Sequence, residues 1–332
     1  MSWTPYYKGT GVHPTDPAKL PKLPALPPWR APDPAAGPQE EAGRRTDLAT
    51  TYRPASGLID AVNAALHLRR PLLLTGRAGS GKSTVIRQIA AELGLGQVLH
   101  WHITSRSTLA DALYRYDALG RIHAHNLRTL DDKVRPDGAD QEDDIGEFVQ
   151  LGPLGTALLP GTRPRALLID EIDKSDLDLP SDLLDVLERG GFEIPELARH
   201  PKPDIVVRTA DTAGKHTIEH GWIQCSEFPA IVLTSNGERD FPAPFLRRCV
   251  RFEMPPLSEE ALTDIVAAHL GDIEDNTTAT LVQTFLKKLS DGEYVAIDQL
   301  LSAIYLLRGD HAPDLDQRQS LEDLLLQGLG RG

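Results

Sequence analysis

Cysteine is nearly absent from this sequence of 332 residues, because only Cys225 and Cys249 occur. Two cysteines cannot build a disulfide framework, so we expect a reducing compartment. The sequence also lacks an apolar run long enough to cross a bilayer. Its first residues are polar and proline-rich, unlike a secretion signal. These absences predict a cytoplasmic protein that does not act in a membrane.

Basic residues are fewer than acidic ones. Lysine and arginine number 35 against 48 aspartates and glutamates, which gives a formal net charge of −13. A surface that coats nucleic acid would carry the opposite charge, although a local basic groove remains compatible with this total. The charge therefore argues against nucleic acid as a partner and favours proteins. Apolar residues make up 40%, enough for a real core, and the length suggests two domains.

Proline is concentrated at the start of the chain. Residues 1–45 hold ten of the 26 prolines, which excludes a helix or a central strand there. The same stretch contains Trp3, Tyr6, Tyr7 and Trp29, which a purely solvating linker rarely carries. We therefore assign residues 1–47 as an extended arm and linker. The arm either docks on a neighbouring subunit or partner, or is a disordered tail.

A glycine-rich turn follows the apolar run at residues 71–75. Gly76 and Gly81 are separated by four residues, and Lys82 and Ser83 come next, which is the phosphate-loop pattern. Glycines let several backbone N–H groups point at one anion, and a helix beginning near Lys82 adds its positive end. We expect Lys82 to reach the β- and γ-phosphates of ATP and Ser83 to hold Mg²⁺. The predicted nucleotide-binding residues are Gly76, Arg77, Ala78, Gly79, Ser80, Gly81, Lys82, Ser83 and Thr84.

Phosphoryl transfer to water also needs a carboxylate for the metal ion and a base for the water. Asp170 and Glu171 follow the apolar strand predicted at 166–169, at the strand end where open α/β sheets bind ligands. We expect Asp170 to bind Mg²⁺ and Glu171 to polarise the attacking water. Asp173 and Asp176 are expected to be solvated or to face a partner.

Polar and basic residues follow two more predicted strands. Asn236 comes after the strand at 231–234, where its amide can hold the attacking water or the γ-phosphate. The alternative is an ordinary Asn-Gly turn. Arg247 and Arg248 precede a short strand at 250–254, and a guanidinium there suits a finger that reaches a neighbouring subunit's γ-phosphate. The alternative is a basic pair on the surface.

These motifs, in this order, resemble an AAA+ ATPase over roughly residues 50–325. The stretch "FVQLGPLGTALLPGTRPRALLIDEID" looks most like the MoxR group. The resemblance implies an α/β P-loop NTPase core at 48–254, a parallel sheet flanked by helices, and an all-helical lid at 255–332. It further implies ATP hydrolysis with Mg²⁺ in a homo-oligomeric, hexameric ring, with Arg248 as the finger and Arg247 able to share that role. MoxR relatives act on partner proteins, typically one of the von Willebrand factor A type, and some belong to bacterial conflict systems.

One departure from the family concerns the lid. Asp298 stands where a sensor-2 arginine is usual, so hydrolysis is expected to be slow or helped by another group. Two alternatives to a remodelling ATPase therefore stay open. One is a nucleic-acid-linked AAA+ motor, and the other is a nucleotide-dependent scaffold that hydrolyses ATP slowly.

The remaining patterns predict local structure. Residues 104–127 favour a helix, a turn and a short strand, and the lid favours helices at 258–269, 277–289, 296–307 and 318–327. Two histidine pairs, His100 with His102 and His123 with His125, are each spaced by one residue. With no cysteine and no evident carboxylate partner, the sequence argues against a metal site at either pair.

Overall fold

A computed structural model describes residues 54–77, 79–134, 145–211, 214–256, 258–270, 276–293, 295–308 and 315–328. The side chains of 127–134, 268, 269, 308, 315 and 316 lie outside that description. The proline-rich arm and Ala78 therefore fall outside the described residues as well. The described chain divides into two compact units, with the break between Pro255 and Pro256.

The first unit is built on a five-stranded sheet in which every neighbouring pair is parallel. Its strands, in spatial order, are β11 (Val250–Glu253), β1 (Leu72–Thr75), β10 (Ala230–Ser235), β5 (Ala166–Asp170) and β2 (Leu99–His102). The prediction of a parallel sheet flanked by helices is confirmed, and its four predicted strands are present. Because Thr75 pairs with Ser235 and Leu233 with Ile169, the carboxyl ends of the three central strands meet at one edge.

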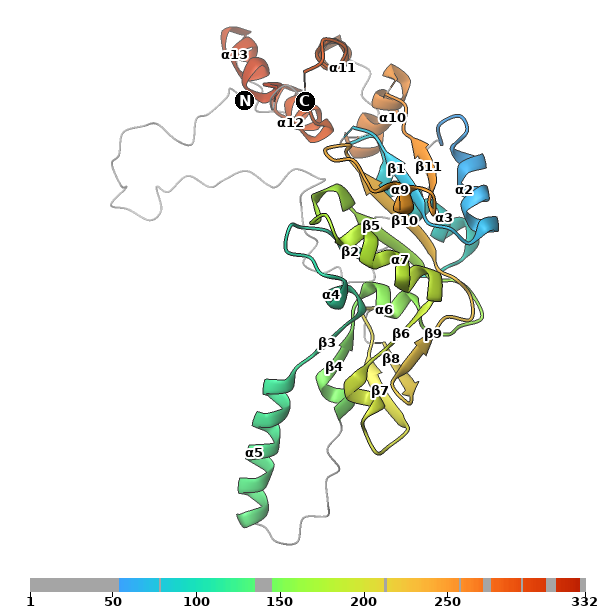
Figure 1. The fold of residues 1–332 in the computed structure, drawn as a ribbon. Helices are drawn as coiled ribbons and strands as arrows, with labels where there is room; N and C mark the ends of the chain where they lie inside the picture. Colours follow the sequence, from blue (N-terminus) through green and yellow to red (C-terminus); the bar gives the residue numbers. More distant parts are fainter. Residues whose placement is uncertain are drawn as a thin grey trace, which may run out of the picture. The chain divides into compact units, whose positions relative to one another are not determined.

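Alternation along the strands gives the sheet two apolar faces. Figure 1 shows the strands of this sheet and the helices around them. Leu72 and Leu74 pack in one buried cluster with residues of α2 (Leu58–Leu68) and α3 (Lys82–Leu93). Leu73 packs in the other cluster with residues of α6 (Pro153–Ala157) and α7 (Leu179–Arg189). Burial on both faces explains why the three central strands, β1, β5 and β10, are largely apolar runs.

A second sheet of six short strands lies in the same unit and was not predicted. Its strands, in spatial order, are β3 (Tyr114–Tyr116), β4 (Val149–Leu151), β7 (Asp204–Arg208), β8 (Lys215–Glu219), β9 (Trp222–Gln224) and β6 (Gly191–Glu193). Only β4 and β7 pair in parallel. Burial alternates along β7, where Ile205 and Val207 are buried and their neighbours are not. This alternation with a period of two is the sequence pattern from which strands of this sheet could have been predicted.

The prediction for residues 104–127 was wrong in its order. The chain forms a short helix, α4 (Leu109–Leu113), then β3 directly, then a long helix, α5 (Ala118–Val134). The Thr108 hydroxyl accepts a hydrogen bond from the Asp111 N–H at 3.2 Å and caps the short helix. Pairing of Tyr114 with Leu151 then draws the following residues into the second sheet. The segment predicted as a strand, with His123 and His125, is helical.

Smaller elements complete this unit. They are the turns η2 (Ile145–Phe148) and η3 (Ile172–Lys174) and the short helices α8 (Pro195–Ala198) and α9 (Ala243–Leu246). Pro195 stands at the first position of α8, where a proline's missing N–H costs no helical hydrogen bond.

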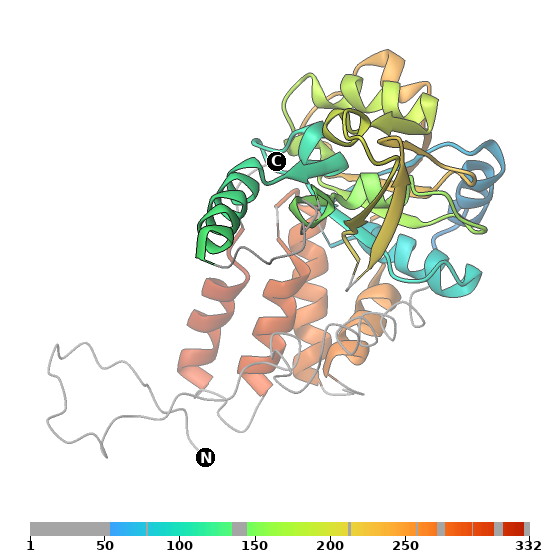
Figure 2. The ribbon, with the colours of Figure 1, turned by 90° about the horizontal axis from the view of Figure 1, so that it is seen from below.

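The second unit is helical, as predicted. Its described elements are α10 (Glu259–Leu270), α11 (Asn276–Ser290), α12 (Ile297–Arg308) and α13 (Leu315–Leu325), drawn in orange to red in Figure 2. They enclose their own core, which includes Val266, Phe285 and Ile304. Among the helices that the structure describes, none is long and apolar enough to cross a membrane.

Candidate nucleotide site

The loop between β1 and α3 has the backbone of an anion cradle. Gly76, Gly79 and Gly81 have φ angles of 146°, 79° and 83°, a region that glycine enters without steric cost. At Gly76 a Cβ atom would also lie 2.9 Å from Cβ of Met254, which is too close for any larger residue. Arg77 is exposed, and Thr84 lies in the first turn of α3, where its N–H donates to Gly81 O at 3.0 Å.

Lys82 is the first residue of α3, and its side chain turns back into the loop. Its Nζ donates to Gly76 O at 2.7 Å, to Arg77 O at 2.8 Å and to Asn236 Oδ1 at 3.0 Å. Burial lowers the pKa of Lys82, and the carboxylates of Asp173, Asp170 and Glu171 oppose that shift. The Lys82 ammonium thus binds the loop carbonyls and also interacts electrostatically with the acidic residues predicted for the same site.

The loop fits a phosphate-bearing ligand. Among the residues that the structure describes, the buried Ser80 hydroxyl has no hydrogen-bond partner, which is costly unless a ligand supplies one. Ser83 is the second residue of α3, and its Oγ donates to Oδ1 of Asp170 at 2.9 Å. A hydroxyl and a carboxylate in contact are oxygen ligands of the kind that Mg²⁺ binds. These residues suit Mg²⁺ and a nucleotide triphosphate.

Asp170 ends β5 beside the loop, as predicted. Its Oδ1 also accepts from the Thr234 hydroxyl at 2.5 Å, and its Oδ2 lies 3.3 Å from His100 Nε2. Burial raises the pKa of Asp170, but the hydrogen bonds from His100, Thr234 and Ser83 outweigh it and lower the pKa to about 2. Asp170 is therefore ionised and oriented at neutral pH.

Glu171 sits in a strained backbone conformation. Its φ of 61° is in the left-handed region, where few non-glycine residues are found, and such outliers cluster at active sites. Its N–H donates to Thr234 Oγ1 at 2.9 Å, which fixes the turn. Its carboxylate accepts from Lys174 Nζ at 2.8 Å. Thr234 thus orients both acidic residues, a role that the sequence analysis missed although a threonine near the end of a buried strand was the visible signal.

Asn236 faces the phosphate loop through its side-chain oxygen, which accepts from Lys82. Its backbone N–H donates to Oδ2 of Asp173 at 2.8 Å, and the Glu238 N–H donates to the same oxygen at 3.2 Å. The expectation that Asp173 is solvated or partner-facing was therefore wrong, since its side chain is buried and holds the turn after β10. Asp176 has a structural role as well, because its Oδ1 accepts from the Leu179 N–H at the start of α7.

Arg247 and Arg248 are not brought to the phosphate loop of their own chain. They precede β11, and the Val250 N–H donates to Pro71 O, so they lie at the end of β1 that is opposite to Gly76. Four strand residues at about 3.3 Å each separate the two ends. Arg248 forms an ion pair with Glu188 of α7 and donates to Pro244 O at 3.1 Å. Its guanidinium is part-exposed at the surface.

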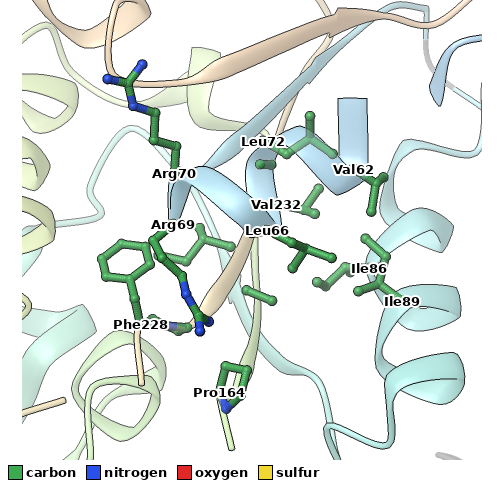
Figure 3. Close-up of a pocket in the computed structure, with 14 residues that line it drawn as sticks. Val62, Leu66, Arg69, Arg70, Leu72, Ile86, Ile89, Pro164, Phe228 and Val232 are labelled. Atoms are coloured by element: carbon green, nitrogen blue, oxygen red, sulfur yellow. The ribbon is translucent and has the colours of Figure 1, made fainter. Parts of the chain in front are cut away.

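A mostly apolar pocket lies beside the start of β1, away from the phosphate loop (Figure 3). Figure 3 shows Leu66 of α2 and Ile86 of α3 on one side and Phe228 with Arg69 on another. Arg69 is paired with Glu227 at 2.7 Å. None of the acidic or amide residues of the candidate site lines this pocket.

Together, the phosphate loop, the acidic end of β5 and the parallel sheet flanked by helices define the fold of an AAA+ P-loop NTPase. Residues 71–220 match the sequence model of the AAA domain family, dynein-related subfamily. The match contains Lys82, Asp170 and Glu171 but ends before Asn236 and Arg248. A comparison with curated proteins found no match.

Among solved structures, the chain is similar to the crystal structure of domain III from the Thermotoga maritima replication initiation protein DnaA. The sequence identity is 14% and the TM-score is 0.41, over 84% of this chain and 96% of that one. A likeness at this level adds nothing about function.

Proposed function

We propose that this protein is a cytoplasmic, MoxR-like AAA+ ATPase that hydrolyses ATP in a homo-oligomeric ring and remodels or activates partner proteins. The observation that carries the proposal is the contact network in which Ser83, Thr234 and Asp170 meet at the mouth of the phosphate loop. A phosphate loop alone would support binding only. A loop serine joined to an ionised carboxylate, with a second carboxylate next in sequence, supports hydrolysis.

Each residue has a defined task in this proposal. Mg²⁺ and ATP supply, when bound, a polarised phosphoryl group and its leaving group. Ser83 and Asp170 would hold the metal ion, and Lys82 would neutralise phosphate charge. Glu171 accepts a proton from the attacking water, and the Asn236 amide orients that water or the γ-phosphate.

Neighbouring residues restrain both Glu171 and Asn236. Lys174 binds the Glu171 carboxylate, and Asp173 fixes the backbone at Asn236. Fixed donors and acceptors need no reorganisation when charge develops, which is the advantage of such a site over water. The same restraints favour an enzyme over the scaffold alternative.

A ring is supported by the position of Arg248. Because the guanidinium lies at the opposite end of β1 from its own phosphate loop, it can serve a nucleotide only if another subunit supplies the loop. A partner protein of the von Willebrand factor A type and a place in a bacterial conflict system extend the same proposal. They rest on the MoxR resemblance alone.

The test is ATPase activity per subunit against protein concentration, at saturating ATP, for wild type, Arg248→Ala and Arg247→Ala. We expect wild-type activity per subunit to rise with concentration and Arg248→Ala to stay flat and low. Arg247→Ala tests whether the adjacent arginine shares this role, and a loss in both variants would assign the finger to the pair. Activity per subunit that is constant with concentration, and equal in wild type and Arg248→Ala, would refute the ring.

A nucleic-acid motor is the alternative that the same assay addresses. Adding duplex or single-stranded DNA should leave the rate unchanged, because the net charge of −13 disfavours phosphate backbones. Stimulation that falls steeply with salt would replace the partner-remodelling proposal with a motor.

A further inference from the structure

Two histidines stand on one face of the sheet's edge strand, β2. Leu99 and Trp101 point into the core, while His100 and His102 are exposed. Residues two apart on a strand share a face, so the two imidazoles lie side by side, with ring centroids 6.3 Å apart. Their side chains are 43% and 55% exposed, which leaves both rings free to adjust toward a ligand.

The neighbouring strand supplies carboxylates to this pair. His100 Nε2 lies 3.3 Å from Oδ2 of Asp170, and His102 Nε2 lies 3.8 Å from Oε2 of Glu171. No carboxylate partner for these histidines is evident in the sequence, which argued against a metal site here, and that premise was wrong. Parallel pairing of β2 with β5 places His102 directly beside Asp170, which no local pattern could show.

The ligand atoms of His100, His102 and Asp170 all lie within 4.8 Å of one another. Asp170 offers this group a different oxygen from the one that faces Ser83, since Oδ1 accepts from Ser83 and Thr234 and Oδ2 faces His100. One carboxylate is therefore positioned between two different ligand environments. The first is built of oxygen atoms and the second of imidazole nitrogens.

We propose that His100, His102 and Oδ2 of Asp170 form a binding site for a transition-metal dication of the Zn²⁺, Co²⁺ or Ni²⁺ class. Imidazole nitrogens favour these ions, whereas Mg²⁺ prefers oxygen ligands, so the two sites differ in selectivity. Glu171 or water can occupy a further position. The regulatory consequence rests on the proposed ATPase function: the bound ion holds Asp170 and draws Glu171 away from the attacking water, so it inhibits hydrolysis.

The other histidine pair provides the control. His123 and His125 have the same spacing but lie on α5, where residues two apart point about 200° from each other around the helix. Within the described residues, they belong to no group of three metal-binding side chains. A difference in metal affinity between variants of the two pairs therefore reflects the geometry of each pair and not the number of histidines.

The test is a titration with Co²⁺, followed by its visible absorption, without nucleotide. Wild type should bind one Co²⁺ per chain, and so should His123→Gln/His125→Gln. His100→Gln/His102→Gln should bind at least about tenfold more weakly. If the double variant does not fold, His102→Gln alone replaces it in the titration. Its thermal melting is compared with that of wild type. Equal Co²⁺ affinity in wild type and either β2 variant, or no saturable absorption in wild type, would overturn the site.

Two further readouts separate this site from the ATPase proposal. Lys82→Ala should lose nucleotide binding but still bind Co²⁺ as wild type does, so the site can be found even if the protein hydrolyses no ATP. In an active enzyme, Zn²⁺ should inhibit Mg²⁺-dependent hydrolysis of wild type and of His123→Gln/His125→Gln alike. If the protein binds Co²⁺ but Zn²⁺ does not inhibit hydrolysis, the metal site stands and its proposed inhibition of the ATPase is refuted.

Discussion

Ser83 Oγ donates a 2.9 Å hydrogen bond to Oδ1 of Asp170, although 87 residues separate the two in sequence. The contact joins the phosphate loop to the acidic strand across β10, which lies between β1 and β5. It predicts that Ser83 and Asp170 act on one metal ion as a unit. In a double-mutant cycle with Ser83→Ala and Asp170→Asn, the losses of Mg²⁺-dependent ATP affinity should not add. Additive losses, measured by calorimetry with and without Mg²⁺, would mean that the residues act independently.

Asp173 is predicted to stabilise the turn that carries Asn236. Asp173→Ala leaves the N–H groups of Asn236 and Glu238 without their acceptor, which should cost about 1–3 kcal/mol of unfolding free energy in total, because Glu238 is exposed and water can replace the acceptor there. ATP hydrolysis should fall as well, because the Asn236 amide loses its fixed position. Asp173→Asn keeps an acceptor oxygen and is the matched control in urea unfolding. Equal stability of the alanine variant and wild type would contradict this role.

Arg248 must leave Glu188 before it can reach a neighbouring subunit. Breaking this ion pair should therefore increase ATPase activity at low protein concentration. Glu188→Gln should lower the protein concentration that gives half-maximal ATPase activity, with little change in stability because the pair is exposed. Asp185→Asn breaks the Arg189 pair on the same helix and is the control. An unchanged concentration dependence in Glu188→Gln would show that the pair does not compete with assembly.

Cys249 gives a prediction about alkaline pH. Burial raises the pKa of its thiol from 9.0 to about 12, opposed by Arg251 and Arg70. The unfolded chain therefore releases this proton at lower pH than the folded one, and the thiol's contribution is present below pH 9 and lost as pH rises toward 12. The advantage of wild type over Cys249→Ala in unfolding free energy should shrink by about 1 kcal/mol between pH 8 and 10. A constant difference would contradict the raised pKa.

The parallel sheet and the helical second unit could be predicted because their signals are local. Buried strands such as Ala166–Asp170 are continuous apolar runs, and this one ends at Asp170, whose carboxylate belongs to the candidate site. The second sheet escaped because its strands are short and their pairing is set by contacts far along the chain, as between Tyr114 and Leu151. Secondary structure of that kind depends on tertiary partners more than on local preference.

The residues that support the site were hidden for the same reason. Thr234 and Asp173 look ordinary in sequence, and only strand register shows that one orients Asp170 and the other holds Asn236. The pairing of His102 with Asp170 is likewise a product of register. Sequence motifs point to the candidate reacting groups, and the contacts that orient these groups follow from the fold.

ATP binding and hydrolysis by Glu171→Gln test the central claim most directly. Glutamine keeps the size and hydrogen-bonding capacity of the side chain but cannot accept the water's proton. We expect ATP affinity close to that of wild type and a hydrolysis rate lower by at least about tenfold, with Lys82→Ala as the variant that loses binding. A Glu171→Gln rate equal to that of wild type would remove Glu171 from catalysis and contradict the proposed hydrolytic site.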